Sequence, residues 1–74
     1  MTKAQALENL EFWTREVVQA YRIGKYPEDG EWVSEIESLC AFWAQRAQEL
    51  GATYHDMERS NAMLRKVAQE VAHV

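Results

Sequence analysis

The sequence predicts an all-α protein, a single helical domain over residues 1–74 in which an N-terminal helix packs against a long second helix. Two observations lead to this fold class. Apolar residues recur at alternating steps of four and three from Ile36 to Val71, a spacing that places their side chains on one face of a helix. The only proline and two of the three glycines fall within residues 24–30, where we expect the chain to turn back.

The first helix is expected to begin at Thr2 and to end near Tyr21 or Ile23. Thr2 and Gln5 have the spacing of a capping box, in which each side chain bonds to the backbone of the other residue. Projected at 100° per residue, the apolar side chains of this helix share one arc. Phe12 lies nearly opposite that arc, so it is not expected in the same core.

The second helix is expected to begin near Glu31 and to continue through Gly51. The four-three rhythm keeps its phase across Gly51, and an interior glycine costs only about 1 kcal/mol relative to alanine. The alternative is a compact three-helix bundle broken at Gly51. In that fold Gly51 is a C-terminal cap, and Thr53 with Asp56 caps a new helix.

A long second helix would leave half of its apolar stripe uncovered. A first helix of about 20 residues spans only about half of a second helix of about 40. A homodimer, in the form of paired helical hairpins with a coiled-coil seam, is therefore expected. The predicted seam comprises Met57, Asn61, Leu64, Ala68 and Val71. Asn61 would pair with its counterpart there and set the register.

Two kinds of residue are expected to contact a different protein. Phe12 and Phe42 are large aromatic residues on otherwise polar helix faces, and such groups are enriched at binding hot spots. Residues 28–37 contain five acids and no base, which favours a partner with a basic surface. From this second group the predicted contacts are Glu28, Asp29, Glu31, Trp32 and Glu35.

Catalytic and cofactor chemistry is not expected. Cys40 lies on the apolar arc of its helix, where a thiol acts as a small buried hydrophobe. His55 and His73 would be about 27 Å apart along one helix, too far to share a metal. We therefore predict no catalytic residue, cofactor or metal site. A cytoplasmic location is expected, because the chain shows neither the apolar run of a membrane span nor the pattern of a signal peptide.

A DNA-binding alternative comes from residues 44–66. Ala47 precedes Gly51 by four residues, and the segment from Thr53 to Lys66 could form a recognition helix. This stretch loosely resembles a helix-turn-helix motif, which implies DNA contacts from Thr53, Tyr54, Arg59 and Arg65. Asp56, Glu58 and the net charge of −4 oppose contact with phosphates, so nucleic acid is not the expected partner.

The favoured prediction is a small non-enzymatic module that binds a larger protein and masks one of its surfaces. Acidic helical chains of this size are typical of adaptors, anti-activators and phage-encoded inhibitors. The mechanism would be steric, since helix faces would cover a functional or assembly surface of the partner.

Overall fold

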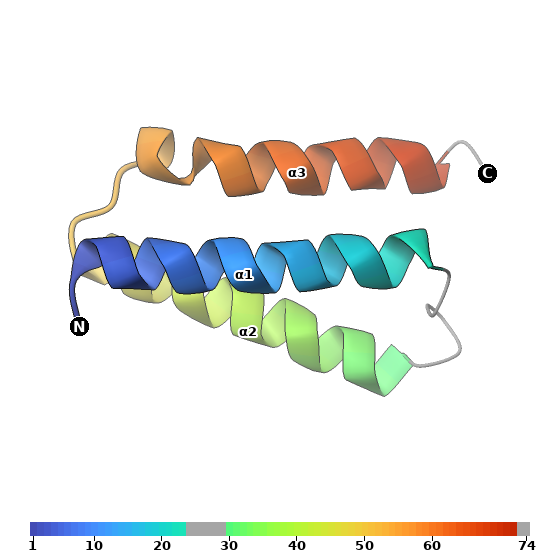
Figure 1. Ribbon diagram of the computed structural model, residues 1–74, viewed down its shortest axis with the longest axis horizontal. Coiled ribbons are helices and arrows are strands. Elements are labelled where there is room, and N and C mark those ends of the chain that lie inside the picture. The colour runs from blue at the N-terminus through green and yellow to red at the C-terminus, as the bar shows by residue number, and fades with distance from the viewer. Residues whose placement is uncertain (24–29, 73–74) are drawn as a thin grey trace.

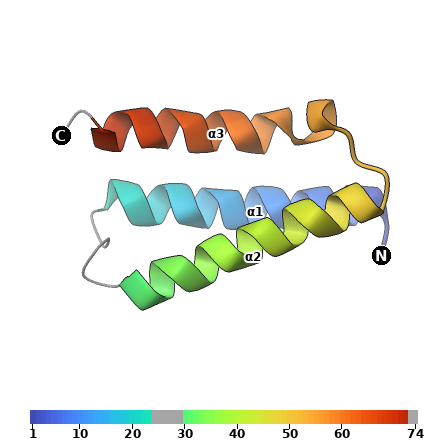
Figure 2. The same cartoon turned by 180° about the vertical axis from the view of Figure 1, so that it is seen from behind.

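The computed structural model describes residues 1–23 and 30–72, except for the side chains of residues 30–33, 71 and 72. Three helices follow one another: α1 (Lys3–Arg22), α2 (Gly30–Glu49) and α3 (Tyr54–Ala72). α1 lies between the other two and packs on both, whereas α2 and α3 make few contacts with each other (Figure 1). Seen from behind, α2 crosses α1 at an angle and α3 runs along the other side of α1 (Figure 2). The all-α prediction and the three-helix alternative are confirmed.

α1 begins with the predicted capping box. The backbone N–H of Gln5 donates to Thr2 Oγ1 at 3.2 Å, and the backbone N–H of Thr2 donates to Gln5 Oε1 at 2.9 Å. Two backbone N–H groups at the helix start therefore have partners, which favours helix formation from this residue onward.

The prediction of one continuous helix through Gly51 is wrong. Gly51 has a φ of 98°, a left-handed conformation that disfavours residues with a Cβ. The N–H groups of Gly51 and Ala52 donate to the carbonyls of Gln48 and Ala47, the two bonds of a Schellman cap. Thr53 and Asp56 then exchange side-chain-to-backbone hydrogen bonds that start α3. The chain reverses here because α3 can bury its apolar face on α1.

The hydrophobic core is centred on α1 and receives side chains from both neighbours. Its buried cluster comprises Leu10, Val17, Ala20, Ile36, Cys40 and Met57. Met57, a residue of the predicted dimer seam, is only 7% exposed, and Leu64 is packed against the same cluster. α1 thus covers part of the apolar stripe that the sequence predicts to face a second chain. Because no long helix is left uncovered, a dimer is not needed to bury it.

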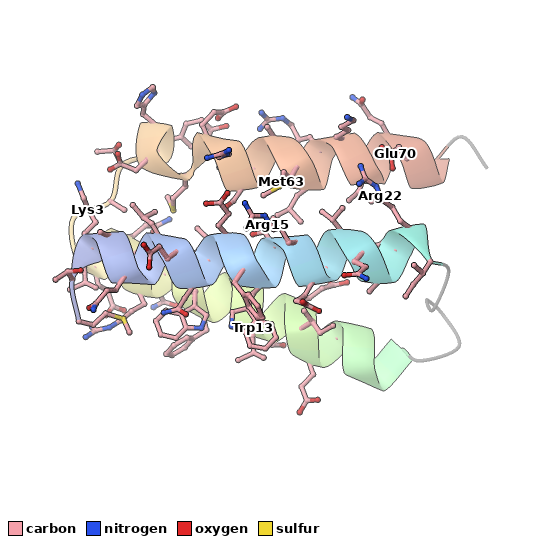
Figure 3. The ribbon with its side chains drawn as sticks, in the orientation of Figure 1. Lys3, Trp13, Arg15, Arg22, Met63 and Glu70 are labelled. Atoms are coloured by element: carbon pink, nitrogen blue, oxygen red, sulfur yellow. The ribbon has the colours of Figure 1, made fainter. Side chains whose placement is uncertain are left out.

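Ion pairs connect α1 to α3 along its length. Lys3 pairs with Asp56 at 3.6 Å, Glu11 with Arg59 at 3.5 Å and Arg22 with Glu70 at 3.0 Å. The Arg22 and Glu70 side chains approach each other between the C-terminal ends of the two helices (Figure 3). Such exposed pairs contribute little because solvent screens them, so apolar burial is the main force between the helices.

Over the residues that the structure describes, none of the three helices is long and apolar enough to cross a membrane.

Candidate binding groove

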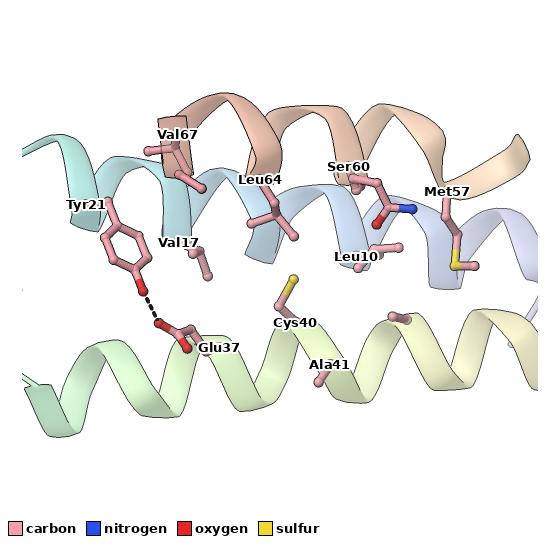
Figure 4. Close-up of a pocket in the computed structure, with 13 residues that line it drawn as sticks. Leu10, Val17, Tyr21, Glu37, Cys40, Ala41, Met57, Ser60, Leu64 and Val67 are labelled. Carbon is pink, nitrogen blue, oxygen red and sulfur yellow. Dashed lines mark hydrogen bonds between the residues drawn. The ribbon is translucent and has the colours of Figure 1, made fainter. Parts of the chain in front are cut away.

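An apolar groove of about 600 Å³ runs between α2 and α3. α1 forms its floor, and α2 and α3 form its two walls (Figure 4). The floor consists of Leu10, Val17 and Tyr21. The groove exists because both walls pack on α1 but hardly meet each other.

The two walls differ in the size of their side chains. The α2 wall carries Glu37, Cys40, Ala41 and Ala44, so it consists mainly of small residues. The α3 wall carries Met57, Ser60, Asn61, Leu64, Val67 and Ala68. Small side chains on α2 do not reach across to α3, and this leaves the space between the helices open.

The hydrophobic core is itself accessible through the groove. Leu10, Val17, Cys40 and Met57 belong both to the buried cluster and to the groove lining. Among the described residues, Thr14 is the largest side chain that is fully buried. Apolar side chains next to an open groove gain free energy when another apolar surface covers them.

Two polar groups of the groove, on Tyr21 and Cys40, have identified partners. Tyr21 donates its hydroxyl proton to Glu37 Oε1 at 2.6 Å, across the end of the groove (Figure 4). Cys40 Sγ lies 3.4 Å from Thr14 Oγ1, whose hydroxyl donates to the carbonyl of Leu10 at 2.7 Å. Among the described residues of the lining, Glu37 is the only charged one. The Cys40 thiol contacts the apolar interior, as its sequence pattern predicts.

Four of the five predicted seam residues lie in the groove. Met57, Asn61, Leu64 and Ala68 all line the α3 wall, while the side chain of Val71 is outside the described residues. The predicted phase is wrong by about one position in part of the stripe, because Ser60 and Val67 are buried and Ala68 is exposed. The contact of these residues with a second copy stays a prediction.

The two phenylalanines predicted to contact a partner do not line the groove. Phe12 and Phe42 are 52% and 56% exposed. Each ring stands edge-on to the adjacent tryptophan, Trp13 or Trp43, with a centroid distance of 5.1 Å in both pairs. Both tryptophans are packed against the core, so each exposed phenylalanine rests on a supported ring. A partner contact by either phenylalanine stays a prediction.

The acidic residues predicted to meet a partner are only partly described. Glu35 is exposed on α2 and does not line the groove. Glu28 and Asp29 lie outside the described residues, as do the side chains of Glu31 and Trp32. Their contacts with a partner therefore stay predictions from sequence.

Several groove residues were not singled out as site residues from sequence. They are Tyr21, Glu37, Ala41, Ala44, Ser60 and Val67. A detectable signal was the small size of Cys40, Ala41 and Ala44 on one flank of α2, which leaves space where no larger side chain fills it. Ser60 gave no signal, because a serine on the inward face weakens the apolar pattern.

The residues proposed for DNA contact are engaged within the chain. Arg59 pairs with Glu11, and Arg65 pairs with Glu58, with Tyr54 adding a further interaction to Arg65. These hydrogen bonds and charges raise the pKa of Arg65 above its ordinary value. Both arginines already pair with carboxylates of this chain, so the structure adds no observation in favour of DNA binding.

Metal-ligating side chains do not gather in the described part of the chain: no group of three or more His, Cys, Asp or Glu residues there could hold an ion. Comparison with family models, with curated proteins and with solved structures finds no match to this chain. Function is therefore inferred from the geometry of the groove and from the sequence.

Proposed function

We propose that this chain is a non-enzymatic protein-binding module whose groove accepts an amphipathic helix of a larger protein. The observation that supports this is the open side of the hydrophobic core between α2 and α3. α1, α2 and α3 resemble three members of a four-helix bundle, and the groove is where a fourth helix packs in such a bundle. Docking of an apolar helix face into a hydrophobic groove is a common recognition mode.

The length of the groove matches a short helix. Its α3 wall runs from Met57 to Ala68, which corresponds to about 17 Å at 1.5 Å per residue. A partner helix of three to four turns covers this length and presents apolar residues at positions i, i+3 or i+4, and i+7. Ala41 and Ala44 leave room on the α2 side for its larger side chains.

The expected affinity is moderate. Burying an apolar side chain such as leucine is worth about 1.5–3 kcal/mol, so three or four anchors give on the order of 8 kcal/mol. Association costs several kcal/mol in lost translational and rotational freedom, which the burial of groove residues partly offsets. The net free energy of binding is then smaller than about 8 kcal/mol, which corresponds to a dissociation constant weaker than about 1 μM, unless Phe12 or Phe42 adds contacts outside the groove.

Masking is the mechanism by which such binding would act. A helix that is held in the groove has its apolar face covered by α1, α2 and α3, and it cannot pack on any other surface at the same time. Inhibition would result if the same helix belongs to an assembly or catalytic surface of its own protein.

A second copy of this chain is another possible occupant of the groove, as the expected homodimer requires. The seam residues Asn61, Leu64 and Ala68 would then face the same helix of the other copy. In both cases the same α3 wall is covered, so variants in that wall test both occupants.

A direct test uses a synthetic helical peptide of about 16 residues with a leucine stripe at helical spacing, and a scrambled peptide of the same composition. Isothermal titration calorimetry measures the affinity of each peptide. Cys40 is the only cysteine and lines the groove, but it is 7% exposed, so its slow alkylation by a small reagent gives a second report on occupancy. We expect the amphipathic peptide to slow alkylation of Cys40 in proportion to its binding. The scrambled peptide should leave the rate unchanged.

Two exposed alanines on α3 provide a matched pair of variants. Ala68 lines the groove, whereas Ala62 does not. Ala68→Glu introduces a carboxylate that a bound helix must desolvate, so peptide affinity should fall at least about tenfold. Ala62→Glu makes the same chemical change outside the groove and should alter affinity less than about twofold. Equal binding by both variants, or no protection of Cys40 in the wild type, would overturn the proposal.

A further inference from the structure

We infer that the helix accepted by the groove carries a lysine or arginine beside its apolar stripe, placed to pair with Glu37. This inference rests on the proposed function and adds the chemistry of the partner. Among the described residues that line this largely apolar groove, Glu37 is the only charged one, and it is exposed. A helix bound beside Glu37 removes water from part of its carboxylate, and this loss is unfavourable unless the helix supplies a cation.

The Glu37 carboxylate is held in place before any partner arrives. Tyr21 donates its hydroxyl proton to Oε1 at 2.6 Å, and this bond connects the α2 wall to the groove floor. Within the described part of the chain, no donor bonds to Oε2 of Glu37. A carboxylate that is already oriented loses less side-chain entropy when a cation binds, which improves a partly exposed ion pair.

Four described arginines of α1 and α3 form ion pairs, and none of these pairs involves Glu37. Arg15, Arg22, Arg59 and Arg65 pair instead with Glu11, Glu70, Glu11 and Glu58. The sequence around Glu37 is strongly negative, because residues 28–37 contain five acids and no base. A positive charge from the partner therefore meets a favourable local field.

The exposed faces of α1 and α2 do not match that partner. Phe12 on α1 has Glu8, Glu16 and Arg15 at helical spacing, and Phe42 on α2 has Glu35, Arg46 and Glu49. Each of these two faces thus offers a single aromatic residue among charges of both signs, and neither forms a basic amphipathic stripe. The inferred occupant is therefore a helix of a different protein.

The test compares two peptides that share one leucine stripe. One peptide carries lysines on both flanks of the leucine stripe at each of its ends, so that a lysine can reach Glu37 in either orientation of the helix. The other peptide carries glutamine at the same positions. The protein variants are Glu37→Gln and, as a control of equal charge change, Glu35→Gln. Glu35 lies two residues away on α2, is exposed and does not line the groove.

We expect wild type to bind the lysine peptide more tightly than the glutamine peptide. Glu37→Gln should lower affinity for the lysine peptide by about two- to fivefold, the range of a partly exposed ion pair. The affinity of this variant for the glutamine peptide should be unchanged or slightly higher. Glu35→Gln should change the logarithm of the affinity for the lysine peptide by less than half as much as Glu37→Gln does. The Glu35 carboxylate is farther from the groove and screened by solvent.

The two proposals fail in different ways. If both peptides bind with equal affinity and Glu37→Gln behaves as Glu35→Gln does, the groove accepts helices and the inference about a basic residue is wrong. If neither peptide protects Cys40 or binds, the proposed function itself is wrong. If Glu35→Gln and Glu37→Gln weaken the lysine peptide equally, general charge attraction accounts for the preference and the specific pairing is excluded.

Discussion

Arg22 near the end of α1 donates two hydrogen bonds to the carboxylate of Glu70 on α3, at 3.0 and 3.1 Å. This bidentate pair joins residues 48 positions apart and holds the C-terminal ends of the two helices together. The hydrogen bonds from Arg22 lower the pKa of Glu70 below its ordinary value of 4.5, and the Arg22 charge contributes in the same direction. The hydrogen bond from the Thr53 backbone likewise lowers the pKa of Asp56 at the start of α3.

These lowered pKa values predict how stability depends on pH. A carboxyl group whose pKa is lower in the folded chain than in the unfolded chain stabilises the fold above the unfolded pKa. That contribution is lost as the pH falls from about 4.5 through the folded pKa of Glu70. We expect the melting temperature to decline over this acidic range. In Arg22→Gln the decline should be shallower, as measured by circular dichroism; an identical decline would show that the Arg22–Glu70 pair does not contribute.

The effect of replacing Gly51 on stability has opposite signs in the two folds that the sequence allows, a continuous helix and a three-helix bundle. In the structure Gly51 has a φ of 98°, and a Cβ placed there meets nothing within 4 Å. Gly51→Ala should therefore destabilise the protein by about 1–2 kcal/mol through backbone conformation alone. In a continuous helix the same change would stabilise by up to about 1 kcal/mol. Chemical denaturation measures the difference, and Ala62→Gly in the middle of α3 is the control for an ordinary helical position.

The capping signals proved more informative about this turn than the apolar rhythm. Thr53, Asp56 and Gly51 together marked an end and a new start, and all three act in those roles. The rhythm continued through the break because both helices bury one face on the same helix, α1. A helix that reverses direction can preserve the four-three spacing, since the steps within each helix remain those of an α-helix.

The groove was harder to predict, because it depends on how three helices are arranged. The sequence identifies an apolar stripe that includes Leu64 and Ala68 but not the surface that faces it. Consecutive residues are rotated by only 100° about the helix axis, so Ser60 and Asn61 lie on neighbouring parts of the surface. Because the buried residue Ser60 is polar, the apolar pattern does not distinguish it from Asn61 as the inward position. The weak contact between α2 and α3 depends on Ala41 and Ala44, whose small size is also compatible with a tightly packed interface.

The paired geometry of Phe12 and Phe42 predicts similar effects on stability. Each is about half exposed and stands edge-on to a tryptophan at the same distance. Phe12→Ala and Phe42→Ala should each destabilise by about 1 kcal/mol, the value of an exposed aromatic contact. Trp13→Ala should destabilise more, by about 2–3 kcal/mol, because Trp13 is packed against the core. Urea unfolding tests this order; a larger loss for Phe12→Ala than for Trp13→Ala would contradict it.

Neither phenylalanine variant should affect the groove. Phe12 and Phe42 do not line it, so the amphipathic peptide should bind Phe12→Ala and Phe42→Ala as it binds wild type. A natural partner that also contacts the phenylalanines would bind these variants more weakly than it binds wild type, whereas the peptide would not. Comparing peptide and partner on the same variants thus separates contacts made inside the groove from contacts made outside it.

The mass of the protein in solution distinguishes an external helix from a second copy as the groove's occupant. With α3 folded onto α1, the described exposed faces of α1 and α2 each carry one large aromatic residue among charged residues, and such faces give little apolar area for self-association. We expect light scattering to give the mass of a monomer, 8.6 kDa, at low micromolar concentration. A dimer that Ala68→Glu dissociates and Ala62→Glu preserves would instead assign the groove to a second copy. A dimer that both variants preserve would require another interface. Phe12→Ala and Phe42→Ala are the variants to measure next, because both phenylalanines are exposed and lie outside the groove.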